Sequence, residues 1–266
     1  MAFTRAGGTS IYYEISGSTG EHVIFVHGSW SDHSNWDLVI PFLSGDFRVL
    51  VYDRRGHGSS ERIAVPGHVE EDVADLAALI EEHRCFPAHV VGNSFGGSIV
   101  LRLAASRPDL LRSMSVHEPP VFSLLDPSLL EPMRPPMTNV LELIASGEHR
   151  SAARAFAETI ALGPGSWDQL TDEIKDMMTF NAPTFLDEQQ DPNWLKIDLQ
   201  ALAAFPNPVL FTRGEQSPKF YSGIINRLAE TIKQSRVVTI PEAGHLPQLT
   251  HPEEYSKLLR KFFIPR

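Results

Sequence analysis

A glycine-flanked serine, Ser94, has the sequence surroundings of a nucleophile. The stretch Gly92-Asn93-Ser94-Phe95-Gly96-Gly97 follows an apolar run and has the pattern G-x-S-x-G. Glycines two residues before and after the serine let a strand and a helix approach closely without a Cβ clash. We therefore predict a sharp strand-to-helix turn that exposes the hydroxyl of Ser94. The amide of Phe95 would then point toward an oxyanion formed there.

A histidine near the end of the chain, His245, has the position expected of the base that this serine needs. It lies in Pro241-Glu242-Ala243-Gly244-His245, just after the last apolar run that predicts a strand. A serine hydroxyl is a weak nucleophile at neutral pH until a base removes its proton. Because functional loops of open α/β sheets gather at the carboxyl edge, we expect His245 to lie near Ser94.

An early turn at Gly28 is expected to supply a second donor to the oxyanion. It follows an apolar run in Phe25-Val26-His27-Gly28-Ser29-Trp30. The amide of Ser29 is the first choice for this donor and the amide of Gly28 is the second. One such donor typically lowers the barrier by about 3 kcal/mol. The side chain of His27 is expected to hold the turn by hydrogen bonds.

The elements that must position these residues alternate between short apolar runs and amphipathic stretches. This alternation predicts an α/β fold, with a mostly parallel sheet covered by helices on both faces. We expect strands at 9–15, 23–26, 48–52, 88–91, 113–117, 209–212 and 236–240, the first two forming an antiparallel pair. Helices are expected at 69–83, 95–106, 220–232 and 253–263.

The pattern changes after the expected strand at 113–117. Prolines crowd the stretch from Pro119 to Pro136, and helical patterns without strands follow at 138–146, 148–162 and 166–180. Roughly ninety residues before the next strand are far too many for a plain connection. We therefore expect a core domain of residues 1–118 and 202–266, with residues 119–201 inserted as a helical cap.

Composition narrows the partners and the location. The net charge of −10 argues against nucleic acid and against anionic membrane surfaces as partners. The single cysteine, Cys85, excludes an internal disulfide, and we expect it to lie partly buried at a helix end. Since the sequence shows neither an apolar run of membrane-spanning length nor a signal sequence, we expect a cytoplasmic protein. The partner is expected to be a small molecule, and the protein a monomer or homodimer.

In combination, these motifs resemble the α/β-hydrolase superfamily along nearly the whole chain. The resemblance rests on His27-Gly28, on Asp53-Arg54-Arg55-Gly56-His57-Gly58-Ser59-Ser60, on the turn around Ser94, and on Gly244-His245. It implies an eight-stranded sheet with a helical cap inserted after the sixth strand. It also implies that the segment 53–60 is mainly a structural turn.

The acid that would orient His245 is where the sequence departs from this family. The family usually places an aspartate where the chain has Ser217, in Gly214-Glu215-Gln216-Ser217-Pro218. Three carboxylates are candidates in its place, Glu118, Glu215 and Asp198, and a triad without an acid is the remaining alternative. We favour Glu118, because some superfamily members carry their acid after the neighbouring strand. The sequence Val116-His117-Glu118-Pro119-Pro120 also resembles the fungal zearalenone lactonases, although Glu118 could instead cap a helix.

The resemblance therefore implies a cofactor-independent serine esterase or lactonase that needs no metal. Ser94 would attack the carbonyl, His245 would move the proton, and Glu118 would steady the imidazolium until water hydrolyses the acyl-enzyme. Apolar residues expected to line the substrate site are Trp30, Phe122, Leu125, Met133, Met137, Trp167, Phe180 and Leu246. A cofactor-free oxygenase, a perhydrolase, a carbon–carbon bond hydrolase and a slowly hydrolysing ligand-binding protein remain alternatives on this scaffold.

Overall fold

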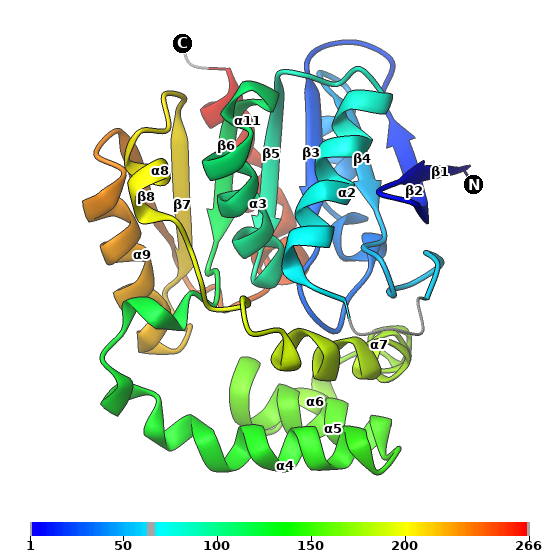
Figure 1. Cartoon of the computed structure of the whole chain (residues 1–266), viewed down its shortest axis with the longest axis vertical. Helices are drawn as coiled ribbons and strands as arrows, with labels where there is room; N and C mark the ends of the chain where they lie inside the picture. The colour runs from blue at the N-terminus through cyan, green and yellow to red at the C-terminus, as the bar shows by residue number, and fades with distance from the viewer. Residues whose placement is uncertain (1, 63–66, 265–266) are drawn as a thin grey trace.

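An eight-stranded sheet runs through the molecule in the computed structural model, which describes residues 2–62 and 67–264 (Figure 1). The strand order is β1-β2-β4-β3-β5-β6-β7-β8. The strands are β1 (Ala2–Ala6), β2 (Thr9–Ser16), β3 (His22–Val26), β4 (Arg48–Tyr52), β5 (Ala88–Asn93), β6 (Leu111–His117), β7 (Val209–Gly214) and β8 (Ser235–Ile240). From β4 to β8 all neighbours pair in parallel, as the α/β prediction requires.

The antiparallel edge of the sheet differs from the prediction in two respects. Strand β1 was not predicted, and β2 does not pair with β3. Instead, β2 lies between β1 and β4 and pairs with both in an antiparallel sense, with Tyr13 opposite Tyr52. The predicted pairing was wrong because strands that follow one another in sequence can be separated in the sheet by a later strand.

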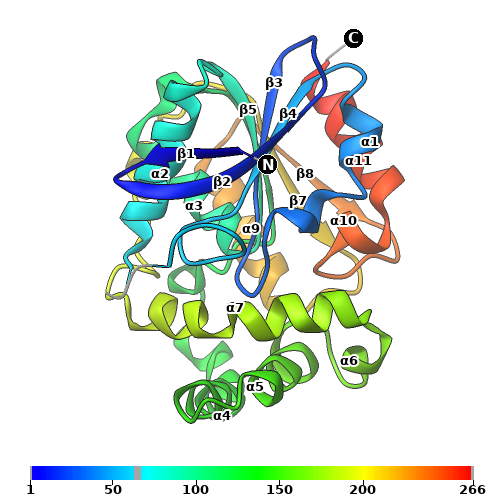
Figure 2. The ribbon, with the colours of Figure 1, turned by 90° about the vertical axis from the view of Figure 1, so that its right-hand side faces the viewer.

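Helices cover both faces of this sheet, as Figures 1 and 2 show. The core helices are α1 (Ile40–Leu43), α2 (Val69–Glu82), α3 (Phe95–Ser106), α8 (Leu199–Ala203), α9 (Lys219–Thr231), α10 (Pro247–Thr250) and α11 (Pro252–Phe263). The helices α2, α3 and α9 share one apolar cluster with the sheet, whereas α1 and α11 share another on the opposite face. Burial of these two apolar clusters stabilises the packing of helices on the sheet, and this packing holds the strand ends that carry the site in place.

A helical segment between β6 and β7 lies across one end of the sheet. Its helices are α4 (Arg134–Ala145), α5 (His149–Phe156), α6 (Ser166–Gln169) and α7 (Asp172–Gln190), with a π-helical turn at Ala157–Ala161. Both ribbon views place α7 between the sheet and the helices α4 and α5 (Figures 1 and 2). The predicted single helix at 166–180 was wrong, because Thr171 caps a new helix by accepting a hydrogen bond from the amide of Ile174.

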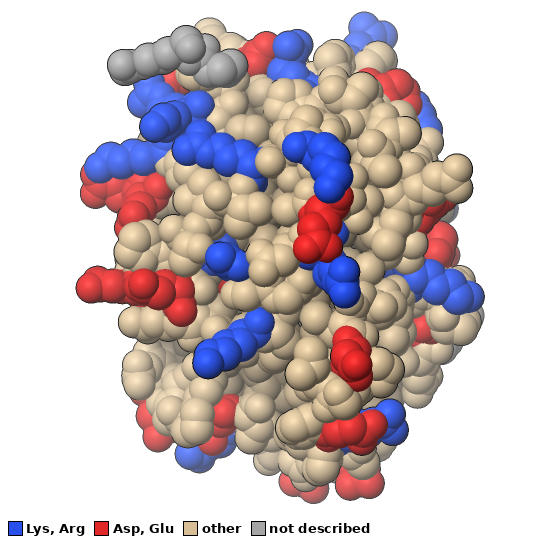
Figure 3. Space-filling view, turned by 90° about the vertical axis from the view of Figure 1, so that its left-hand side faces the viewer, with Lys and Arg blue, Asp and Glu red and all other residues tan. Residues whose placement is uncertain are grey.

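The boundaries proposed for core and cap remain a prediction, and residues 1, 63–66, 265 and 266 within the proposed core lie outside the described residues. In the part of the chain that the structure describes, no helix has the length and apolar character needed to cross a membrane. On the face drawn in Figure 3, Lys and Arg side chains are interspersed with Asp and Glu. Cys85 is buried, and burial raises the pKa of its thiol to about 11.

Candidate active site

The turn that carries Ser94 connects β5 to α3 and has a strained backbone. Ser94 has φ 54° and ψ −127°, a conformation that residues other than glycine rarely adopt. The close approach of strand and helix needs glycine, because a Cβ on Gly96 would lie 2.2 Å from the carbonyl oxygen of Val26. Ser94 itself is only partly buried. The turn therefore presents the hydroxyl at the end of the sheet.

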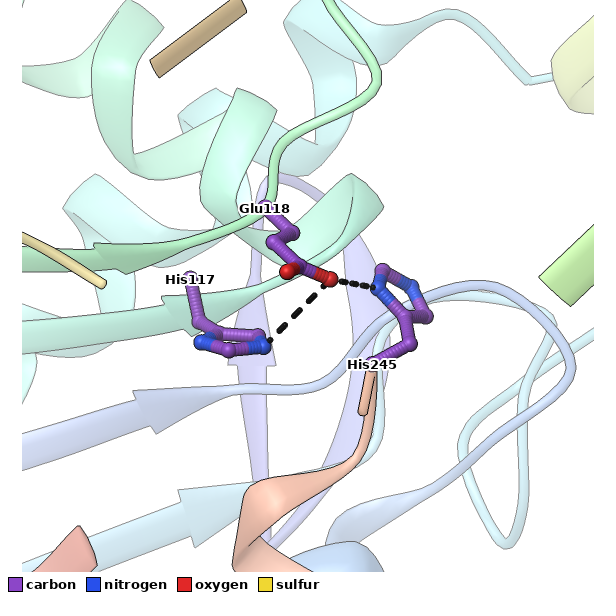
Figure 4. A group of neighbouring side chains, drawn as sticks. All are labelled: His117, Glu118 and His245. Carbon is purple, nitrogen blue, oxygen red and sulfur yellow. Dashed lines mark hydrogen bonds and ion pairs between the residues drawn. The ribbon is translucent and has the colours of Figure 1, made fainter. Parts of the chain in front are cut away.

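The imidazole of His245 meets the carboxylate of Glu118 in a direct hydrogen bond. The Nδ1 atom of His245 lies 2.7 Å from Oε2 of Glu118, and both side chains are buried (Figure 4). His245 follows β8, while Glu118 immediately follows β6. The carboxylate fixes the tautomer with the proton on Nδ1, which leaves Nε2 free to accept a proton.

Glu118 is held in place by the loop where the family was expected to carry its acid. Its Oε1 accepts a hydrogen bond of 2.8 Å from the amide of Gly214, at the end of β7. Its backbone takes φ 45°, which turns the side chain at the strand end at the cost of local strain. Although burial by itself raises the pKa of Glu118, the imidazoles of His117 and His245 lower it well below its usual range.

The other carboxylates that sequence analysis considered point elsewhere. Glu215 accepts a hydrogen bond of 3.0 Å from the amide of Glu242, on the exposed side of the loop. Asp198 caps α8 by accepting from the amide of Ala201. Ser217 lies in the loop after β7, where its amide donates to the carbonyl oxygen of Gly214. Among the described carboxylates, Glu118 is the one paired with His245.

A second buried histidine, His117, adjoins the same carboxylate (Figure 4). Its Nε2 lies 3.5 Å from Oε2 of Glu118, and its Nδ1 lies 2.9 Å from the hydroxyl of Thr212. The ligand atoms of His117, Glu118 and His245 lie within 4.8 Å of one another, as in a metal site. However, the separation of 2.7 Å between Glu118 and His245 is that of a hydrogen bond and is shorter than two ligands of one zinc ion normally allow.

The predicted oxyanion donors flank Ser94. Phe95 begins α3, and Gly28 packs so closely that a Cβ there would lie 2.9 Å from Cβ of Ser94. Ser29 follows Gly28 in the loop after β3. Within the described residues, the amides of Phe95 and Ser29 make no backbone or side-chain hydrogen bond, so both are available to a substrate. The carbonyl of Gly28 accepts from Nδ1 of His27, 2.8 Å away, which fixes the turn.

A small apolar cavity opens onto Ser94 and His245. Its volume is about 60 Å³. Two of the predicted lining residues, Trp30 and Leu246, line it. The rest of its wall is formed by the loops around Ser94, by Leu249 on α10 and by the segment between β6 and β7. The residues of that segment are Phe156, Ala161, Leu162, Leu170, Ile174, Met177 and Met178.

The remaining residues expected in the pocket lie elsewhere. Phe180 is 54% exposed and lies under the guanidinium of Arg62, so its assignment was wrong. Phe122 stacks edge-on against Trp194 and Phe220, and Leu125 joins the same cluster as Phe122. Trp167 and Met137 pack among the helices of the segment between β6 and β7, and Met133 lies in the 3₁₀ turn before α4. All of these were chosen by residue type, which does not reveal which helix face meets the cavity.

Two contacts of the site carried no signal in the sequence. The side-chain Nδ2 of Asn93 donates to the backbone oxygen of His245 at 3.1 Å, which connects the serine turn to the histidine loop. The phenol ring of Tyr221 stacks on the imidazole of His245. The first contact joins residues 152 positions apart and the second joins residues 24 positions apart, so neither lies within one local motif.

A family model provides the family assignment. The model, described as the alpha/beta hydrolase family, matches residues 23–258. The chain belongs to the alpha/beta hydrolase family. Among solved structures, an alpha/beta hydrolase from Sphaerobacter thermophilus superposes on this hydrolase with a TM-score of 0.80 and 28% identity, covering 99% of this chain and 100% of the other.

Relatives of this hydrolase carry several descriptions. A protein from Gibberella zeae described as an AB hydrolase superfamily protein is 38% identical over 129 residues, which are 48% of this chain and 44% of that protein. This hydrolase therefore matches less than half the length of that relative. A pimeloyl-[acyl-carrier protein] methyl ester esterase from Neisseria meningitidis is 26% identical across 90% of this chain and 76% of the esterase.

Proposed function

We propose that this hydrolase cleaves a carboxylic ester or a lactone through an acyl-enzyme on Ser94, without a cofactor. The observation that carries the proposal is the hydrogen bond of 2.7 Å between Glu118 and His245, beside a cavity that both His245 and Ser94 line. A carboxylate on Nδ1 of a histidine that lines the same cavity as a strained serine supports acyl transfer as the chemistry.

In the proposed reaction, Ser94 Oγ attacks the substrate carbonyl while Nε2 of His245 takes the hydroxyl proton. The negative charge that develops on the carbonyl oxygen is met by the amides of Phe95 and Ser29. Glu118 stabilises the imidazolium, which then protonates the departing alcohol. A water molecule activated by His245 hydrolyses the ester bond to Ser94 and regenerates the enzyme.

The cavity supports an uncharged, apolar acyl group. Apart from the imidazole of His245, the described residues that line it bear no ionisable side chain, and most of them are apolar. A carboxylate or an ammonium group would be costly to bury there without a partner. The relative described as a methyl ester esterase agrees with an ester as the bond cleaved.

The test is labelling and turnover by a serine variant and its matched control. Ser94→Ala should abolish labelling by a fluorophosphonate probe and turnover of p-nitrophenyl esters. Ser98→Ala, one turn along the same helix, should keep both. Unchanged ester turnover by Ser94→Ala would overturn the proposal. Stoichiometric labelling of the natural protein without turnover of any ester or lactone would favour a ligand-binding role instead.

A further inference from the structure

A carboxylate from the inserted segment reaches the loop that carries Ser29. Glu188, on the last turns of α7, accepts a hydrogen bond of 2.5 Å from the hydroxyl of Ser29. Glu188 is 7% exposed. The two residues are 159 positions apart in the chain, so this bond joins the segment between β6 and β7 to the loop after β3. Its effect is to hold the residue whose amide is the proposed oxyanion donor.

The second oxygen of Glu188 is occupied by an arginine that touches the other donor residue. Nη2 of Arg54 donates to Oε1 of Glu188 at 2.9 Å, and the guanidinium also pairs with Asp72. The same guanidinium lies over the ring of Phe95, 4.6 Å from its centroid. One buried ionic cluster thus contacts both Ser29 and Phe95.

Helix α7 holds the loop at a second point. The side chain of Asn181 donates to the backbone oxygen of Ser31 at 3.1 Å. Asn181 and Glu188 are seven residues apart on α7, so they lie on one face of the helix. Two polar side chains on this face therefore bind the same short loop beside Ser94.

The charges in this cluster argue for positioning rather than direct electrostatic assistance. One guanidinium, that of Arg54, faces the two carboxylates of Asp72 and Glu188. Burial raises the pKa of Glu188, although Arg54 and the hydroxyl of Ser29 oppose that shift. A carboxylate this near an oxyanion would repel it, so the benefit must come from geometry. An oxyanion donor works only when it is held at hydrogen-bond distance from the developing charge.

We propose that Glu188 is a positioning residue that sets the amide of Ser29 for oxyanion binding, so that docking of α7 on the sheet completes the site. The inference rests on the proposed function. Loss of the bond between Glu188 and Ser29 should slow the chemical step and leave ground-state binding almost unchanged, because Glu188 does not line the cavity and the apolar side chains of its wall stay in place.

A double-mutant cycle tests this coupling. Ser29→Ala and Glu188→Ala should each lower kcat for a p-nitrophenyl ester by roughly tenfold, with KM within about twofold. Binding of a trifluoromethyl ketone, which forms an oxyanion on the serine, should weaken by a similar factor. Because both changes remove one bond, the double variant should lose much less than the product of the two losses.

Two further variants separate positioning from folding. Glu188→Gln keeps a group that can bond the hydroxyl of Ser29 and should recover most of kcat. Arg62→Ala removes a different bond between the core and α7, the one of 2.6 Å to the backbone oxygen of Phe180, and should leave kcat unchanged. Should Glu188→Ala fail to fold, Ser29→Ala and Glu188→Gln still decide the matter, since both keep an oxygen at position 188 that can accept from Arg54.

Multiplicative losses in the double variant, or an effect on KM in place of kcat, would overturn the inference. An unaltered kcat in Ser29→Ala would do the same. These outcomes are distinct from failure of the proposed function, which would appear as ester turnover that survives Ser94→Ala. An inactive Ser94→Ala together with an uncoupled cycle would leave the serine chemistry standing and remove the role of Glu188 alone.

Discussion

The imidazole of His245 lies face to face with the phenol ring of Tyr221. Their centroids are 4.6 Å apart, the planes differ by 12°, and the phenol oxygen lies 3.4 Å from Nε2. Tyr221 is buried on α9, so its ring restricts how the imidazole can turn. Glu118 holds the edge of the imidazole ring, and Tyr221 holds its face.

Tyr221→Leu is expected to lower kcat by about tenfold, whereas Tyr221→Phe should stay within about threefold of the natural protein. An aromatic face stabilises a nearby cation by about 1–2 kcal/mol when it is shielded from water, and phenylalanine keeps that face. Steady-state kinetics on one p-nitrophenyl ester measure both. A loss in Tyr221→Phe as large as that in Tyr221→Leu would instead assign the effect to the hydroxyl.

Glu118→Gln is expected to reduce kcat on the order of 10⁴-fold, because a neutral amide neither fixes the required tautomer nor stabilises the imidazolium. Glu215→Gln is the matched control, since that carboxylate bonds a backbone amide on the exposed side of its loop. It should retain nearly full activity. If Glu215→Gln alone abolished turnover, the acid would be misassigned.

His27 is expected to weaken the fold as the pH falls. Burial, with a smaller contribution from Arg54, lowers its pKa from 6.5 to about 3. Between these two values the unfolded chain binds one proton more than the folded protein, so stability rises with pH by up to about 1.4 kcal/mol per unit. His27→Gln should flatten this dependence in urea unfolding at pH 4, 5 and 6.

The control for that series is His251→Gln, at the start of α11. The free energy of unfolding of the His251→Gln variant should change with pH as that of the natural protein does. A slope left unchanged by His27→Gln would mean that other groups set the acid sensitivity.

Gly96→Ala is expected to destabilise the protein by about 2 kcal/mol or more, because its Cβ would meet the backbone of β3 at 2.2 Å. Gly45→Ala, at a position with no heavy atom within 4 Å of the added Cβ, should change little. Thermal unfolding measures both, with an expected drop of roughly 5 °C for Gly96→Ala. Equal melting temperatures for the two variants would contradict the packing seen at the turn.

Met178→Ala is expected to shift the substrate preference toward longer acyl chains, because it removes volume from the cavity wall. Phe180→Ala changes an exposed ring on the same helix and should not shift it. Comparing kcat/KM for p-nitrophenyl acetate, butyrate and octanoate distinguishes the two. An identical profile for Met178→Ala would place the acyl group elsewhere.

The parallel strands and their helices could be predicted because buried parallel strands are continuous apolar runs, as in β3 and β4. Strand β1 could not, since Ala2–Ala6 is short, contains an arginine, and gains its pairing only from β2. Local sequence was also sufficient to predict the sharp turn at Ser94, because a Cβ at Gly92 or Gly96 would clash with neighbouring backbone atoms.

The contacts that complete the site depend on tertiary packing instead. On α7, Met178 lines the cavity and Phe180 faces solvent, because two helical steps carry a side chain to the opposite side. The sequence analysis predicted one helix at 166–180, so the helix faces of Met178 and Phe180 could not be assigned correctly. The bond between Ser29 and Glu188 likewise exists only once α7 has docked.

The segment between β6 and β7 leaves and rejoins the sheet at adjacent strands, with Met114 opposite Val209. It leaves β6 at the carboxyl edge of the sheet and enters β7 at the opposite edge after α8, so the part before α8 can change in length without moving any other strand. Natural variation or a designed chimera can replace the part of the cavity wall that this segment supplies and keep Ser94, His245 and Glu118 in place. The exchanged segment would have to begin after Glu118 and keep a hydrogen-bond partner for Ser29. Apart from these two requirements, the residues of the segment can change and alter substrate preference.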